Sequence, residues 1–167
     1  IIGVLGFVLA ACSTSSNEPT TTLLASSEGP IFVGADDVGS DVSDTSRIVV
    51  LNGDLVEVIF ALGAGDRVVG RDLTTTYPPE ALAVPDIGLG RQLNAGAVIG
   101  LAPTLVIGGT QIEPLSAIEQ IRAAGIPVVI LDLEATLPGV SRKIETVAEI
   151  LGLDDQGAAL AQEVEAE

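Results

Sequence analysis

The chain has 167 residues, with 7 Lys and Arg against 23 Asp and Glu, a formal net charge of −16 and no histidine. Without histidine, this sequence cannot form a Ser-His-Asp triad, a Cys-His dyad or a His-ligated metal site. Its single cysteine cannot form an internal disulfide. The acidity argues against nucleic acid as a partner, because phosphates require a basic surface. The 47% hydrophobic content with only 2% aromatics predicts an aliphatic core, in one domain or one lobe of a larger protein.

Residues 1–12 resemble the end of a bacterial lipoprotein signal. The apolar run Ile1–Ala11 is shorter than the roughly 20 residues that span a bilayer. Its last residues, Leu9-Ala10-Ala11-Cys12, resemble a lipobox, so Cys12 is the expected lipidation site and a membrane anchor outside the cytoplasm. The alternative is a buried strand or helix that ends in cysteine. Because the run lacks a basic start and a helical pattern reaches Glu167, we expect a fragment of a longer protein.

Residues 13–46 are rich in serine and threonine and contain acidic but no basic residues. Such a segment buries little apolar surface, so it is predicted to be a tether between the lipid and the folded part. Within it, Ile31–Val33 and Ala35–Gly39 have the pattern of a small hairpin.

Residues 47–153 are predicted to form an α/β lobe with a parallel sheet. Uninterrupted apolar runs are typical of strands buried on both faces, and four of them occur here: Ile48–Leu51, Val68–Val69, Leu105–Ile107 and Val128–Leu131. Amphipathic helical patterns alternate with these runs, which predicts helices on both faces of the sheet.

The predicted helices have recognisable ends. The first is expected to be capped by Asp54 and to end before Gly63, and the second to run from Pro114 to Gly125. A short turn is expected at residues 95–101. The most regular apolar stripe runs from Val140 to Leu151, and a last helix is predicted over residues 154–167.

Ligands of open parallel sheets bind at the carboxyl ends of the strands, so the loops there hold the candidate residues. Asn52-Gly53-Asp54 follows the first strand and could face an anion, or it could be an ordinary helix N-cap. The loop from Arg71 to Pro79 holds Tyr77, the only tyrosine, which either contacts a ligand or packs against its own loop. A further loop brings Arg91. No pair of carboxylates has a spacing that demands acid/base chemistry, and no phosphate-binding glycine motif is present.

From Arg47 to Glu167 the sequence resembles the N-terminal lobe of iron/cobalamin-type substrate-binding proteins of ABC importers, and most of all their hemin-binding branch. The order of the matching blocks is more specific than any one of them. These blocks are Arg47–Glu57, Ala61–Asp72, Thr75–Pro78, Pro85–Gly88, Arg91–Leu93 and Leu101–Val106.

The resemblance implies a Rossmann-like lobe of a two-lobe periplasmic-binding fold, with the ligand in the cleft between the lobes. Residues 154–167 would then begin the interlobe helix, and the second lobe would follow. The family's Thr-x-Tyr-Pro loop places Tyr77 as an axial ligand of ferric heme, with Thr76 beside it. Arg71 and Arg91 would pair with the propionates, and Asn52 and Gly53 would contribute to the same site. Hemin would be cargo, with no intrinsic cofactor and no enzymatic activity.

The resemblance also implies an ABC permease and its ATPase subunits as partners. The Glu through which such lobes usually dock is replaced here by Gly96, which leaves the docking contact open. Two alternatives remain from the sequence. The same fold could bind a ferric siderophore or cobalamin, or the chain could be an extracytoplasmic α/β enzyme or carbohydrate-binding module.

Overall fold

The computed structural model describes residues 30–166. Its main element is a four-stranded sheet in the order β4-β3-β5-β6, in which all neighbouring strands are parallel. The strands are β3 (Ile48–Leu51), β4 (Val68–Arg71), β5 (Leu105–Gly109) and β6 (Val128–Leu131). The predicted parallel α/β fold is therefore confirmed.

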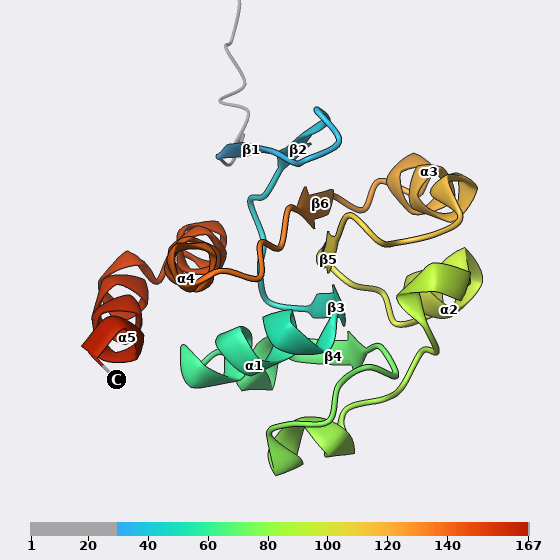
Figure 1. The fold of residues 1–167 in the computed structure, drawn as a ribbon. Coiled ribbons are helices and arrows are strands. Elements are labelled where there is room, and N and C mark those ends of the chain that lie inside the picture. The colour runs from blue at the N-terminus through green and yellow to red at the C-terminus, as the bar shows by residue number, and fades with distance from the viewer. Residues whose placement is uncertain (1–29, 167) are drawn as a thin grey trace, which may run out of the picture.

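Helices cover both faces of the sheet (Figure 1). One face packs against α1 (Gly53–Ala61), α4 (Leu137–Leu151) and α5 (Asp154–Ala166), and the other against α2 (Ala95–Gly100) and α3 (Leu115–Ala123). Successive residues of β3 alternate between the two cores, so Ile48 and Val50 face the first while Val49 and Leu51 face the second. Burial on both faces explains why these strands are continuous apolar runs.

The helix ends follow the sequence signals, with one correction. Gly63, Gly125 and Gly152 all have positive φ beyond the ends of α1, α3 and α4, as predicted. The cap of α1, however, is Asn52 rather than Asp54. The Asn52 side-chain oxygen accepts a hydrogen bond from the Asp54 amide at 2.8 Å, because an N-cap side chain bonds to an amide of the first turn.

A two-stranded hairpin precedes the sheet. It pairs β1 (Ile31–Val33) with β2 (Gly39–Asp41) in antiparallel register. The hairpin was predicted, but its second strand begins later than expected because residues 34–38 form the turn, with Asp37 at φ 57°.

The hairpin is attached to β6. The Ala35 amide donates to the Ile130 carbonyl at 2.6 Å, and the buried Ser40 hydroxyl donates to the Val128 carbonyl at 2.9 Å. Val42 then enters the core. Residues 31–42, in the second half of the segment predicted to be a tether, thus form a hairpin that is attached to β6. The remainder of that segment before Pro30, the predicted signal and Cys12 lie outside the described residues.

The last helix, α5, packs along α4. Gly157 lies directly against Ala148, and the Ser141 hydroxyl donates to a Glu165 carboxylate oxygen at 2.8 Å. In the part of the chain that the structure describes, no helix is both long and apolar enough to cross a membrane.

Candidate functional site at the carboxyl edge of the sheet

The strand order creates a switch point at the carboxyl edge of the sheet. From β3 the chain moves outward to β4, and it then crosses to the opposite side of β3 to form β5. The loops after β3 and β5 therefore diverge, and open α/β sheets bind ligands in the crevice that such divergence leaves.

A hollow of about 260 Å³ lies at this switch point. The loops after β3, β4 and β5 meet there, together with the turn Gly90–Gln92. Its lining combines backbone, polar and aliphatic groups from Leu51, Asn52, Asp72, Thr74, Leu89, Gly90, Arg91, Gly109, Gln111 and Ile112. Of the residues predicted from sequence, the hollow brings together Asn52 and Arg91.

The N-terminus of α1 is already occupied by the protein's own groups. The Gly53 amide donates to the Thr74 hydroxyl oxygen at 2.9 Å, and the Asp54 amide donates to Asn52. These amides do not point free hydrogen-bond donors at an anion. Of the two interpretations offered by the sequence, the structure has the ordinary N-cap.

Tyr77 is displayed on the loop that follows β4. Its side chain is 60% exposed, and its hydroxyl makes no hydrogen bond within residues 30–166. Thr76 beside it is also exposed. Tyr77 is therefore exposed rather than packed against its own loop.

Arg71 and Arg91 are held in different ways. The Arg71 guanidinium donates to the carbonyls of Ala81 and Asp72 at 3.1 and 3.2 Å and pairs with Asp86 at 3.5 Å. Its side chain is only 11% exposed, so it braces the turn Pro79–Ala83 against β4. Arg91 is exposed, and its guanidinium donates to the Gln111 side-chain oxygen at 2.8 Å. Arg91 therefore presents its charge to the hollow, whereas Arg71 does not line it.

Asp72 is the buried acid of the site. Burial raises the pKa of its carboxyl above the ordinary value of 3.8, while hydrogen bonds from Thr74 and Gly90 oppose that rise. The sequence singled out the loop that holds Asp72 and Thr74, but not these two side chains, and it did not single out Gln111. Their position directly after buried strands was the signal available for Asp72 and Gln111.

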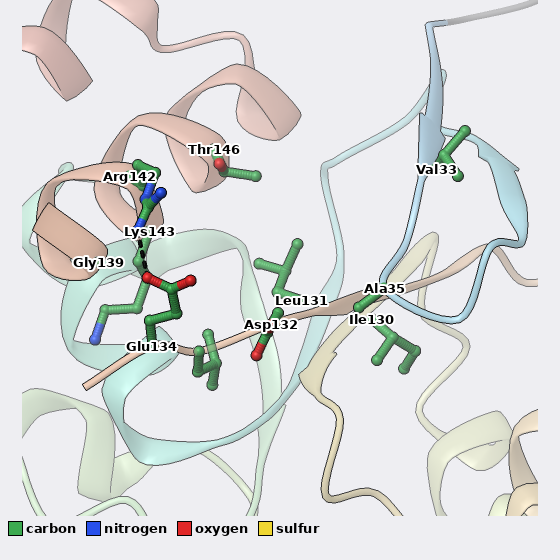
Figure 2. Close-up of a pocket in the computed structure, with 11 residues that line it drawn as sticks. Val33, Ala35, Ile130, Leu131, Asp132, Glu134, Gly139, Arg142, Lys143 and Thr146 are labelled. Atoms are coloured by element: carbon green, nitrogen blue, oxygen red, sulfur yellow. Dashed lines mark hydrogen bonds and ion pairs between the residues drawn. The ribbon is translucent and has the colours of Figure 1, made fainter. Parts of the chain in front are cut away.

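A second hollow, of about 300 Å³, lies between the hairpin and α4 (Figure 2). Val33 and Ala35 line one side, and α4 residues line the other. Its cations are paired with acids: Arg142 with Glu134, and Lys143 with Asp54 at 3.7 Å. The charges of this hollow therefore serve to join α4 to neighbouring segments.

Comparison with known proteins supports the same architecture. The family described as "Periplasmic binding protein" matches residues 48–167. The "Uncharacterized ABC transporter substrate-binding lipoprotein YvrC" of Bacillus subtilis is 29% identical over 96% of this chain and 52% of its own length. A "Cobalamin-binding protein" of Halobacterium salinarum is 32% identical over 73% of this chain and 33% of its own.

Among solved structures, the "Periplasmic heme-binding protein RhuT" of Roseiflexus sp. RS-1 in apo form is 47% identical, with a TM-score of 0.70. The match covers 74% of this chain and 47% of that one. The present chain thus spans about half the length of these proteins, or less. The family resemblance inferred from the sequence is confirmed.

Proposed function

Because the chain belongs to the periplasmic binding protein family, we propose that it is the N-terminal lobe of an ABC importer's substrate-binding lipoprotein that captures hemin. In this role the carboxyl edge of the sheet forms one wall of the ligand cleft. The chain binds and delivers cargo, and is not an enzyme.

The observation that carries the proposal is Tyr77. A phenol at the carboxyl edge, 60% exposed on a loop after a buried strand, is placed to reach a ligand above that edge. A phenolate is a hard anionic ligand for ferric heme iron. Within residues 47–167 no other side chain is as well suited to axial ligation, because these residues contain no histidine, methionine or cysteine.

The charge of the site supports a ligand with carboxylates. Arg91 is exposed, lines the hollow and has only the neutral Gln111 as its bonded side chain. Guanidinium forks match carboxylate geometry, so Arg91 is the residue that would hold a propionate. Arg71, whose guanidinium is committed to Asp86 and two carbonyls, would act on the loop rather than on the ligand.

The rim of the carboxyl edge supports a flat apolar ligand. Exposed leucines lie on the loops and helix starts that follow the strands' carboxyl ends: Leu73, Leu89, Leu115 and Leu137. A porphyrin ring would bury such side chains, and apolar burial is favourable by about 25 cal/mol per Å².

Cobalamin is the second candidate ligand, because a relative named a cobalamin-binding protein matches 73% of this chain. The low aromatic content speaks against it, since aromatic walls suit a corrin ring. A ferric siderophore remains the third ligand to test.

The proposal extends to the partners and the location. Cargo would pass to a membrane permease that is driven by ATPase subunits, and lipid at Cys12 would anchor the protein outside the cytoplasmic membrane. A relative named a lipoprotein supports the anchor. Gly96 on α2 occupies the position of the usual docking Glu and is exposed. Glu57 on α1 is also exposed, and it is the acid to test for contact with the permease.

The test is a titration of the complete protein, from which only the predicted signal segment, residues 1–12, has been removed. The ligands are hemin, cobalamin and a ferric siderophore. We expect saturable hemin binding at one site, with a Soret spectrum that Tyr77→Phe alters. If the Soret spectrum is unchanged in Tyr77→Phe, a residue other than Tyr77 is the axial ligand of the heme iron. Binding of cobalamin or siderophore without hemin would refute the hemin assignment.

A further inference from the structure

The buried carboxylate of Asp72 joins three segments that form the ligand edge. Asp72 follows β4 directly, is 3% exposed, and its amide donates to the Val50 carbonyl of β3 at 3.1 Å. Its side chain lines the hollow, and Asp72 is the first residue of the loop that carries Tyr77. A buried acid needs hydrogen-bond donors, and the donors present here are Thr74 of the same loop and the backbone of Gly90 in the turn Gly90–Gln92.

A chain of hydrogen bonds runs from α1 to this carboxylate. The Gly53 amide donates to the Thr74 hydroxyl oxygen at 2.9 Å, and the Thr74 hydroxyl donates to Asp72 Oδ1 at 2.7 Å. The direction is fixed, because an amide can only donate and a carboxylate can only accept. The Gly90 backbone also hydrogen-bonds to Asp72. Thr74 and the Gly90 backbone therefore share the Asp72 carboxylate as acceptor, and the start of α1 is joined to it through the Thr74 hydroxyl.

Close packing reinforces this chain. A Cβ atom on Gly53 would stand 2.7 Å from the Thr74 carbonyl oxygen, so the loop backbone passes directly over the first residue of α1. By contrast, the Tyr77 hydroxyl has no hydrogen bond to the described residues, so the loop backbone that carries it has to hold it in place.

We propose that Asp72 and Thr74 are positioning residues, which hold the loop after β4 against the start of α1 and thereby set where the Tyr77 phenol stands. This inference rests on the proposed function for the identity of the ligand. Neither residue is assigned contact with the iron. Their effect on the ligand passes through the loop.

Thr74→Val removes the hydroxyl from the chain of hydrogen bonds at nearly constant volume, and Thr74→Ser retains it. The adjacent Thr75 offers a matched control. Its side chain is buried, and its hydroxyl has no partner within the part of the chain that the structure describes. Thr75→Val therefore makes the same chemical change one residue away without breaking a bond.

Two measurements on the full-length protein test the proposal. Amide hydrogen exchange at Gly53 reports the bond itself, and hemin titration with the tyrosinate-to-iron(III) absorption reports Tyr77. For Thr74→Val we expect exchange at Gly53 at least tenfold faster, hemin affinity about tenfold weaker and a shifted absorption band. Thr74→Ser should restore all three, and Thr75→Val should match wild type.

The outcomes separate the two proposals. Unchanged Gly53 exchange in Thr74→Val, or equal loss of hemin affinity in Thr75→Val, overturns the positioning role. If Thr74→Val speeds Gly53 exchange but the wild-type protein does not bind hemin, the hydrogen-bond chain still anchors the loop. In that case only the proposed hemin function is refuted.

Discussion

Gly53→Ala is the most direct perturbation of the contact between α1 and the loop after β4. The added Cβ would lie 2.7 Å from the Thr74 carbonyl oxygen and 3.2 Å from the Thr75 Cα. The first distance is about 0.7 Å short of the 3.4 Å at which ordinary van der Waals contact begins. Because the obstructing atoms are backbone, no side-chain rotation can relieve the clash, and the loop has to move away from α1.

Two opposing effects determine how much Gly53→Ala changes the free energy of unfolding. Alanine is favoured over glycine in a helix by about 0.5–1 kcal/mol, whereas overpacking of this kind costs about 1–3 kcal/mol. We therefore expect a net loss of unfolding free energy between about 0 and 2.5 kcal/mol, with a central value of about 1 kcal/mol. The shift should also lengthen the 2.9 Å bond from the Gly53 amide to Thr74 and weaken hemin binding in the full-length protein.

Urea unfolding gives the free energy, and Gly100→Ala is the matched control. Gly100 is the last residue of α2, and a Cβ there would meet nothing within 4 Å. It should therefore show the helix gain without the clash. If Gly53→Ala is as stable as Gly100→Ala and binds hemin like wild type, the close approach between α1 and the loop does not constrain the site.

Three further predictions concern stability. The pKa of Asp72 is raised above 3.8 in the folded state, so between pH 3.8 and the raised pKa the native state binds more protons than the unfolded state. The contribution of Asp72 to the free energy of unfolding should therefore fall as pH rises through this range. In Asp72→Asn, the urea midpoint should change less steeply with pH over the same range. Gly157→Ala would place a Cβ 2.3 Å from that of Ala148 and should cost about 1–3 kcal/mol; adding Ala148→Gly should recover part of the loss in a double-mutant cycle of unfolding free energies. Arg122→Met should release the hairpin, because Arg122 pairs with Asp36 at 2.8 Å; hydrogen exchange at the hairpin amides should accelerate, and an unchanged rate would contradict this role.

The sheet and helices could be predicted because their signals are local. Burial on both faces makes β3 an unbroken apolar run, and α1, α3 and α4 each carry an apolar stripe with a glycine after the helix end. The order of short blocks along the chain then identified the family, although each block alone was weak. The loops of the candidate site followed from the same reasoning, since parallel strands end at one edge.

The bonds within the site were not predictable from local signals. Arg71 forms an ion pair with Asp86. The two residues lie side by side because their backbones form an isolated parallel β-bridge after the intervening turn. The docking of the hairpin depends on the Val128 and Ile130 carbonyls, some ninety residues away along the chain. Serine and threonine composition suggested a tether because a composition does not record which hydroxyls find buried acceptors.

The strong acidity of the chain makes the few cations informative. Six of the seven basic side chains bond to backbone carbonyls or pair with acids: Arg47, Arg67, Arg71, Arg122, Arg142 and Lys143. Arg91 bonds instead to the neutral side chain of Gln111 and lies exposed at the hollow. In a chain of net charge −16, a cation that is not paired with an acid is the local exception that would attract a carboxylate-bearing ligand to this edge.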